Sequence, residues 1–372
     1  MRGRSLVART LYWIAPVPTP YLDYLWRHVL SAIPTTTVVV KNFASGGHPW
    51  KSKLGEGYRI ESADKKGLDW SIFRLAKERD AFFVCAGWEN RTFIVMLTLL
   101  RLLGRDYILW TDTPNPNRSG GWLKESLRGA WVRWIFRGAR AIMSTGRPGV
   151  EAMIRYGAPA DRVVNFPFFL DLAAYPPRPL DPNPPAKVRM VSSGRIIHRV
   201  KGHDLAVRAL AAALKDTPVD CEYCIAGTGP DEKALIELSQ QLGIADKVRC
   251  LGWTEPADLR RLMCESHVLV HPSPIPDPFP NAVLEAMAAG MVVLGSDVCG
   301  SVKDRVEEGV SGFVHKAGDV DELAEHLRTV LRGRERLGAM GAAARRTAES
   351  WPVERGVAKI VDLYQGRFPP VN

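Results

Sequence analysis

Residues His271 to Asp304 read HPSPIPDPFPNAVLEAMAAGMVVLGSDVCGSVKD and contain the most informative pattern in the sequence. The apolar run Ser266–Val270 before it is typical of a buried strand, and a proline-rich loop follows. This loop carries Asp277 and leads into an expected helix with Pro280 near its first position, where proline is favoured because its missing N–H would be unpaired anyway. The free N–H groups at the start of this helix predict a binding site for a phosphate or another anion.

Glu285 lies inside the same expected helix, eight residues after Asp277. Its neighbours are almost all apolar or small, and a carboxylate in such a helix needs a partner. Two carboxylates in these places suit a ligand whose phosphates are flanked by hydroxyl groups, as in a nucleotide sugar. The alternative is that Asp277 caps the helix and that Glu285 lies on its solvated face.

Short apolar runs alternate with amphipathic stretches along the whole chain, a pattern typical of βαβ units in a parallel sheet. The chain has 372 residues, enough for two domains. The proline-rich segment 173–185 predicts an interdomain linker. We therefore expect an α/β protein with domains at 1–172 and 186–351, and an amphipathic tail at 352–372 whose helix crosses back to the first domain. Strands are expected at 11–15, 36–40, 81–85, 107–110, 141–144, 163–166, 187–192, 222–226, 248–251, 267–270 and 292–295, and helices at 21–30, 92–103 and 320–331, among others.

An unusual segment follows each expected strand of the second half. Open parallel sheets bind ligands outside the carboxyl ends of their strands, so all five segments are expected on one edge. Arg195 and Lys201 would there meet the negative charge of a departing diphosphate, although either could also be solvated surface charge. The five segments are Gly194 to Gly202, Gly227-Thr-Gly229-Pro230, Gly252-Trp253-Thr254, the Asp277 loop, and Ser296 to Gly300.

Several other classes of protein lack support in the sequence. No GxGxxG follows the first strand of a domain, which argues against a dinucleotide oxidoreductase. The sequence has no GxxxxGK[ST] loop, which argues against a P-loop nucleotidase, and no GxSxG nucleophile elbow. Asp319-Val-Asp321 resembles a metal–nucleotide pattern, but it is explained more simply as a helix N-cap with an acidic first turn. We therefore expect neither a metal ion nor a cofactor.

The distribution of charge along the chain indicates where an anionic partner would bind. Residues 1–180 hold 26 Lys and Arg against 14 Asp and Glu, whereas residues 181–372 hold 24 against 26, so an anionic partner is expected on the first half. Aromatic and basic residues are little interleaved in the sequence, so it gives little support for nucleic acid as that partner.

The cysteines and the N-terminus indicate the compartment. The six cysteines suit reduced, buried thiols, and Arg9 interrupts any apolar signal region. No segment reaches the ~20 apolar residues that span a bilayer. These features predict a cytoplasmic protein.

Residues 122–140, WLKESLRGAWVRWIFRGAR, combine aromatic and aliphatic side chains with five cations. Such a stretch could lie on an anionic membrane surface at the inner face of the cell membrane. A core-packed helix with a basic outer face explains the same pattern, and the sequence leaves both interpretations open.

Residues from about 187 to 335 resemble the donor-binding half of retaining glycosyltransferases of family GT4 (glycosyl transferases group 1). That family has the GT-B fold, two Rossmann-like domains facing a central cleft. The motifs that carry the resemblance are Ser193-Gly-Arg195…Lys201-Gly202, Ala226-Gly-Thr-Gly-Pro230, Leu251-Gly252-Trp253, His271-Pro-Ser273, Asp277…Glu285-Ala-Met-Ala and Ser311-Gly312-Phe313.

The resemblance implies metal-independent transfer of a sugar, with retention, from a UDP- or GDP-sugar to a glycan or lipid-linked acceptor. Arg195 and Lys201 would hold the donor diphosphate, Glu285 the ribose, and Asp277 would stand beside the sugar; Asp277, Arg195 and Lys201 are thus the expected catalytic residues. The remaining donor-binding residues implied are Gly194, Gly227, Gly229, Leu251, Trp253, Ser273, Phe279, Pro280 and Asn281.

Two departures from the family pattern stand out. Asp277 is one methylene shorter than the family's Glu, and Pro16 to Tyr21 replaces a Gly-Gly loop after the first strand. A nucleotide-sugar epimerase or hydrolase on the same scaffold, or a non-catalytic nucleotide-sugar-binding module, therefore stays an alternative. The resemblance is faint over residues 1–140. The acceptor-side candidates, all at expected strand ends, are Trp88, Glu89, Asn90, Asp112, Thr113 and Ser144.

Overall fold

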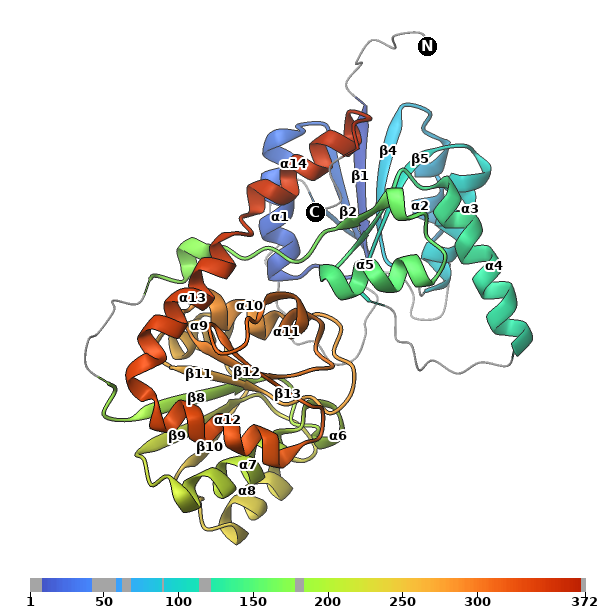
Figure 1. Ribbon diagram of the computed structural model, residues 1–372. Helices are drawn as coiled ribbons and strands as arrows, with labels where there is room; N and C mark the ends of the chain where they lie inside the picture. The colour runs from blue at the N-terminus through green and yellow to red at the C-terminus, as the bar shows by residue number, and fades with distance from the viewer. Residues whose placement is uncertain are drawn as a thin grey trace. The chain divides into compact units, whose positions relative to one another are not determined.

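The computed structural model describes residues 9–41, 58–61, 68–88, 90–113, 122–177 and 184–368. Residue contacts divide the chain into two compact units, Met1–Phe169 with Val353–Asn372, and Leu170–Pro352. Each unit is a parallel sheet with helices on both faces (Figure 1). In the part of the chain that is described, every helix is too short or too polar to cross a membrane.

The first unit contains a seven-stranded parallel sheet in the order β3-β2-β1-β4-β5-β6-β7. The order reverses between β1 and β4, as in a Rossmann fold. Six of these strands match predicted runs, and β3 was not predicted. The strands are β1 (Thr10–Ala15), β2 (Thr36–Lys41), β3 (Tyr58–Glu61), β4 (Ala81–Ala86), β5 (Asp106–Thr111), β6 (Ala141–Ser144) and β7 (Val163–Asn165).

Helices cover both faces of this sheet because its central strands are apolar on both sides. Phe83 belongs to a buried cluster with residues of α3 and α4, and Trp13 to a second cluster with residues of α1 and α14. Continuous apolar runs such as Ala81–Ala86 are what a doubly covered parallel strand requires. The helices are α1 (Pro20–Ala32), α2 (Trp70–Phe73), α3 (Arg91–Leu102), α4 (Trp122–Gly138), α5 (Gly146–Arg155) and α14 (Val353–Tyr364).

The C-terminal helix α14 packs on the first unit beside α1 (Figure 1). Ile360 is fully buried in the cluster around Trp13, and Lys359 donates a 2.8 Å hydrogen bond to the carbonyl oxygen of Asn165. Burial lowers the pKa of Lys359 to about 8. The amphipathic tail therefore crosses back to the first unit, as predicted.

The second unit contains a six-stranded parallel sheet in the order β10-β9-β8-β11-β12-β13. This is the Rossmann order, and its reversal lies between β8 and β11. Five strands match predicted runs, and the edge strand β13 was not predicted. The strands are β8 (Val188–Ser193), β9 (Cys221–Ala226), β10 (Val248–Gly252), β11 (Val268–His271), β12 (Val292–Ser296) and β13 (Gly312–His315).

Eight helices connect or flank these strands among the described residues. A buried cluster joins one sheet face to α7, α8 and α12 through residues such as Val207, Leu235 and Leu327. Asp319 caps α12 by accepting a 3.0 Å hydrogen bond from the Glu322 N–H, so the predicted N-cap is confirmed. The helices are α6 (His198–Lys201), α7 (His203–Asp216), α8 (Glu232–Gln241), α9 (Pro256–Cys264), α10 (Asn281–Ala288), α11 (Gly300–Arg305), α12 (Val320–Arg332) and α13 (Leu337–Glu349).

Candidate functional site

The loops after β8 and β11, the two strands at which the sheet order reverses, are joined by an ion pair. Lys201 Nζ lies 2.5 Å from Asp277 Oδ2, and the two side chains are 19% and 17% exposed. The crevice at such a reversal is where open α/β sheets bind ligands. The pair therefore places two of the predicted site residues at the expected position in the sheet.

Backbone hydrogen bonds connect the other predicted segments along the same edge. Gly227 N–H donates to the Gly252 carbonyl (2.9 Å), and Ile196 N–H donates to that of Thr228 (2.9 Å), which ties together the loops after β8, β9 and β10. Gly300 N–H donates to the Asp277 carbonyl (2.9 Å), which ties the loop after β11 to the loop after β12. The Lys201–Asp277 ion pair connects these two sets of loops. All five predicted segments therefore lie together at one edge of the sheet.

Two glycines make the close approach of these loops feasible. Gly227 has a φ of 155°, and a Cβ atom there would overlap the carbonyl oxygen of Gly194. A Cβ atom on Gly229 would overlap the carbonyl oxygen of Ile196. Both contacts are with backbone, which cannot move aside as a side chain can, so the GTG turn is required for packing.

The carboxylate of Asp277 is the centre of a polar cluster and does not cap α10. The N-cap residue of α10 is Pro280, with no side-chain capping bond, so Pro280 lies next to the first helical residue, near the position predicted. Asp277 Oδ2 lies 3.0 Å from His271 Nε2 and accepts a 3.4 Å hydrogen bond from Ser273 Oγ, in addition to its contact with Lys201. The capping alternative for Asp277 is therefore wrong.

Burial and partners set the charges in this cluster. Burial by itself would raise the pKa of Asp277, but hydrogen bonding to His271 and the charges of Lys201 and His271 hold that pKa below its usual value. Burial by itself would lower the pKa of His271, but the neighbouring Cys299 and Asp277 raise it to about 9. At neutral pH the raised pKa of His271 favours its protonated form, so the Asp277 carboxylate lies between two positively charged partners, Lys201 and His271.

The raised pKa of His271 predicts a loss of stability in alkaline solution. A group with a raised folded-state pKa stabilises the fold below its unfolded value of about 6.5, and this stabilisation is lost as pH rises through about 9. Between pH 7 and pH 10 we expect the wild type to lose about 1–3 kcal/mol more unfolding free energy than His271→Gln. Urea unfolding across that range measures the difference, with His28→Gln as the control. Parallel curves for the wild type and His271→Gln would contradict the assignment.

Glu285 is half-buried and is contacted by a tyrosine that the sequence analysis did not single out. Tyr175 Oη donates a 3.3 Å hydrogen bond to Glu285 Oε1, and the tyrosine is only 4% exposed. Burial, and then the charge of Glu285, raises the pKa of Tyr175, so it remains a neutral donor. Arg345 fixes the backbone here by donating to the carbonyl oxygens of Tyr175 and Ala288. Glu285 is thus an oriented acceptor, and the alternative of a fully solvated face does not describe it.

Arg195 is exposed and makes no side-chain hydrogen bond or ion pair with the residues that the structure describes. It follows Gly194, whose Cα is flanked by Lys201: a Cβ there would lie 3.5 Å from Lys201 Cε. The backbone of Arg195 therefore begins beside the Lys201 side chain, and its exposed guanidinium is accessible to a ligand. The structure supplies no contact between Arg195 and Glu285.

The start of α10 is packed tightly around the remaining donor-side residues. Phe279 is 3% exposed, and the Pro280 carbonyl accepts a 3.1 Å hydrogen bond from Ser301 Oγ. Asn281 Oδ1 is buried and has no hydrogen-bond partner among the described residues. The first N–H groups of a helix lack intrahelical acceptors, so this end of α10 can receive an anion.

Two donor-binding candidates, Leu251 and Trp253, lie at the carboxyl end of β10, Leu251 within the strand and Trp253 directly after it. Leu251 is half-buried, and Trp253 is 44% exposed with its indole N–H donating 2.9 Å to Glu255. An exposed indole at the carboxyl edge of the sheet offers a flat apolar surface.

The acceptor-side candidates of the first unit divide into two groups. Trp88 is 4% exposed and stacks on Phe136 at a ring-centroid distance of 5.3 Å, and Asn90 caps α3 by accepting from the Phe93 N–H. These contacts give both residues a structural role. Glu89 lies outside the described residues.

The second group, Asp112, Thr113 and Ser144, lies at the adjacent carboxyl ends of β5 and β6. Asp112 Oδ1 accepts hydrogen bonds from Thr145 Oγ1 (2.5 Å) and from the Thr113 N–H (2.9 Å). The hydroxyls of Thr113 and Ser144 are buried without hydrogen-bond partners among the described residues, and a Cβ on Gly149 would crowd both. These unpaired hydroxyls make this group the better acceptor-side candidate of the two.

Helix α4 is packed into the core of the first unit. Val132, Ile135 and Phe136 are buried in the cluster that covers one face of the sheet, whereas Arg133 and Arg137 are exposed. A core-packed helix with a basic outer face is therefore the arrangement over its described side chains.

One group of potential metal ligands occurs among the described residues, and the sequence analysis did not identify it. The ligand atoms of His271, Asp277 and Cys299 lie within 4.8 Å of one another. A divalent ion would compete with the Lys201 ammonium for the same carboxylate oxygen and would need His271 neutral, against its raised pKa. These charges do not favour a cation.

Comparison with known proteins identifies the second unit. Residues 181–347 match the family "Glycosyl transferases group 1". This segment is a group 1 glycosyl transferase domain. The D-inositol 3-phosphate glycosyltransferase of Nocardia farcinica is 29% identical over 229 residues, covering 57% of this chain and 49% of the relative. The GDP-mannose-dependent alpha-(1-6)-phosphatidylinositol monomannoside mannosyltransferase of Mycolicibacterium smegmatis is 27% identical, covering 50% and 53%.

The chain spans about half the length of the curated glycosyltransferases that it matches. Solved structures of the GT-B class cover almost all of it. HepE of Anabaena, in complex with UDP and glucose, superposes with a TM-score of 0.72 at 17% identity, covering 96% of this chain and all of that one. The galactosyltransferase WaaB, in its apo form, superposes with a TM-score of 0.68 at 15% identity, covering 96% and 99%. The predicted GT-B fold class is therefore confirmed.

Proposed function

We propose that the chain transfers a sugar from a UDP- or GDP-sugar to a glycan or lipid-linked acceptor, with retention at the anomeric carbon and without a metal ion. The observation that carries this proposal is the Lys201–Asp277 pair at the reversal of the second sheet, beside the start of α10. The mycobacterial mannosyltransferase is GDP-mannose-dependent by name and HepE was solved with UDP and glucose, which supports a nucleotide-sugar donor.

The charges of the site suit departure of a nucleoside diphosphate. As the bond from the anomeric carbon to the diphosphate oxygen breaks, negative charge grows on that oxygen. Arg195, Lys201 and the N–H groups of α10 would stabilise this charge in fixed positions, which lowers the barrier without reorganisation. Asp277 holds Lys201 in place and would stand beside the sugar, with the shorter side chain leaving room for the donor.

A thermal-shift screen against UDP, GDP, ADP and their sugars tests donor binding. We expect one base to raise the melting temperature and the others to have smaller effects. Product analysis with donor alone and with acceptors then separates transfer from the alternatives. Donor consumed without acceptor would indicate an epimerase or hydrolase, and donor bound but never consumed would indicate a binding module. NMR of the new linkage reports retention, and unchanged turnover in EDTA is expected if no metal takes part.

Tyr175→Phe is expected to weaken nucleotide affinity about 3- to 10-fold with kcat within about twofold, because the hydroxyl orients Glu285 for the ribose. Calorimetry with the nucleoside diphosphate found in the screen, together with KM and kcat, measures the effect. Tyr156→Phe, at a 40% exposed residue of the other unit, is the control. A drop in kcat without a change in affinity would contradict the orienting role.

The acceptor would be met by the first unit, where Asp112, Thr113 and Ser144 lie at the carboxyl edge. The basic excess of residues 1–180 supports a lipid-linked acceptor at an anionic membrane surface, and the six free cysteines, four of them buried, support a reducing cytoplasmic compartment. Sedimentation with anionic vesicles is expected to fall at high salt, and sedimentation that salt does not change would count against electrostatic attraction.

A further inference from the structure

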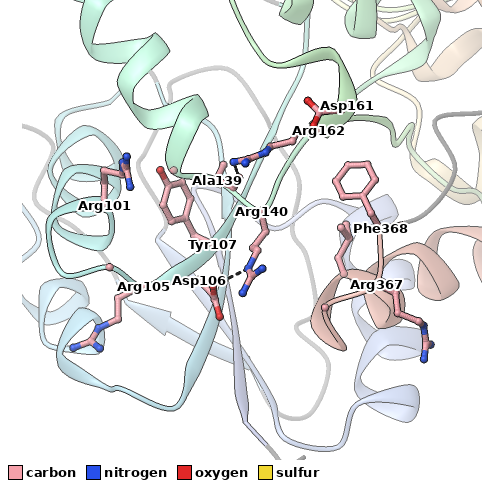
Figure 2. Close-up of a pocket in the computed structure, with 14 residues that line it drawn as sticks. Arg101, Arg105, Asp106, Tyr107, Ala139, Arg140, Asp161, Arg162, Arg367 and Phe368 are labelled. Atoms are coloured by element: carbon pink, nitrogen blue, oxygen red, sulfur yellow. Dashed lines mark hydrogen bonds and ion pairs between the residues drawn. The ribbon is translucent and has the colours of Figure 1, made fainter. Parts of the chain in front are cut away.

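The first unit contains a pocket of about 630 Å³ that takes no part in the proposed reaction. Its walls come from four separate parts of the chain, and Figure 2 shows Arg140 near its middle, with Arg162 above it, Arg101 and Arg105 on one side and Arg367 and Phe368 on the other. The charged residues that line it are Arg101, Arg105, Asp106, Arg140, Asp161, Arg162 and Arg367.

This pocket lies at the edge of the sheet opposite to the acceptor-side candidates. Asp106 is the first residue of β5, Arg140 directly precedes β6, and Arg162 directly precedes β7. In contrast, Asp112 and Ser144 stand at the carboxyl ends of β5 and β6. Because parallel strands have their amino ends on one edge and their carboxyl ends on the other, the pocket is separate from the candidate acceptor site.

The charge of the lining is strongly positive. Five arginines face two aspartates, which leaves a formal charge of +3. The C-terminal ends of α3, α4 and α14 also lie here, and each contributes about half a negative charge. Three such ends amount to about −1.5, so they reduce the positive charge without cancelling it.

Neighbouring groups hold four of the five guanidiniums in place. Arg140 pairs with Asp106 at 2.8 Å, and Arg367 with Asp362 at 2.7 Å. Arg105 donates to the carbonyl of Ala76, and Arg162 to those of Arg137 and Ala139 at the end of α4. Each guanidinium has five N–H donors, so every one of these arginines retains donors for a ligand.

Arg101 is the least satisfied of the five. Its Nε is buried and has no hydrogen-bond partner among the described residues, and its guanidinium lies over the ring of Trp134 at 5.6 Å. A Cβ on Gly138 would overlap this side chain, so the glycine leaves the space that Arg101 occupies. The fold thus keeps a cation in a position where no described protein oxygen neutralises it.

We propose that this pocket binds a phosphate group, carried either by a soluble phosphate ester or by the headgroup of a membrane lipid. Fixed arginines match the geometry and charge of phosphate, and the pocket volume is within the range of small-ligand sites. Phe368 lines the pocket and is 43% exposed, and the exposed Leu102 and Leu103 directly follow Arg101. These apolar side chains make a lipid headgroup one of the two sources to test.

Two assays on the full-length protein distinguish the sources. Equilibrium dialysis with glycerol 3-phosphate measures binding of a soluble ester. Sedimentation with phosphatidylcholine vesicles, with and without phosphatidic acid, measures binding of a lipid headgroup. The pocket variant is Arg101→Gln/Arg162→Gln. The control is Arg208→Gln/Arg336→Gln, which removes two exposed arginines of the other unit and changes net charge equally.

Saturable binding of glycerol 3-phosphate that falls at least about 10-fold in the pocket variant, but not in the control, would establish a soluble source. Binding confined to phosphatidic acid vesicles, with the same dependence on the two variants, would establish a lipid source. Should the pocket variant melt at a lower temperature, Arg367→Gln, at a side chain 63% exposed, tests the pocket without disturbing the fold and is expected to weaken binding about threefold. Absence of binding in both assays, or equal loss in pocket and control variants, would overturn the proposal.

Discussion

Replacing Arg195 with Ala is expected to lower kcat by about 10²–10³ and to leave the melting temperature unchanged. The exposed guanidinium has no described protein partner, so the fold loses nothing when it is removed. In the proposed reaction it stabilises charge that appears only as the diphosphate departs, and removing one such preorganised group has an effect of this size. Steady-state kinetics with the donor found by the screen measure the loss.

Arg208→Ala is the control for Arg195→Ala, since it removes another exposed arginine of the same unit. Its turnover should match that of the wild type. Near-wild-type turnover by Arg195→Ala would remove Arg195 from the mechanism, and a large fall in its melting temperature would show that the residue has a structural role instead.

Lys201→Met is expected to lower kcat at least about 100-fold and, unlike Arg195→Ala, to destabilise the protein by about 1–3 kcal/mol. Removing the ammonium leaves the largely buried carboxylate of Asp277 with His271 as its one remaining charged partner among the described residues. Kinetics and urea unfolding measure the two effects separately. Lys233→Met, at a lysine whose side chain is 90% exposed, is the control.

The double variant Lys201→Met/Asp277→Asn separates the two roles of the pair. It removes the unpaired buried charge, so part of the lost stability should return, whereas activity should stay low because the cation is still missing. Recovery of activity together with stability would show that Lys201 acts only by neutralising Asp277, and the diphosphate role would then be wrong.

Most of the fold could be predicted because its signals are local. Continuous apolar runs between amphipathic stretches identify eleven strands, and the parallel topology then places the segments around Arg195, Gly227 and Asp277 on one edge. The two missed strands carry weak signals. Tyr58–Glu61 places one apolar residue, Ile60, beside charged ones, and Gly312–His315 is a short edge strand that begins with glycine.

The parts of the site that could not be predicted depend on contacts between distant residues. Tyr175 lies in a proline-rich segment that suggested only a linker, and its partner Glu285 is 110 residues away. The contact of His271 with Asp277 and Cys299 requires the loops after β11 and β12 to meet. The packing of Trp88 was also not predicted, because its place at a strand end suggested a ligand contact and gave no sign that its ring stacks on Phe136.

The arginine pocket had no sequence signal. Its residues come from the ends of α3, α4 and α14 and from the segments before β5, β6 and β7, and no motif links them. Only the basic excess of residues 1–180 pointed to an anionic partner, without giving its place.

The most direct test of the account compares the affinities of a nucleoside diphosphate and its monophosphate for the wild type and for Arg195→Ala, by calorimetry with the base that the thermal-shift screen selects. If Arg195 and Lys201 hold the second phosphate, the wild type should bind the diphosphate at least about 10-fold more tightly, and Arg195→Ala should lose most of that preference while binding the monophosphate as before. Equal preference for the diphosphate in both proteins, or no preference in the wild type, would contradict the account.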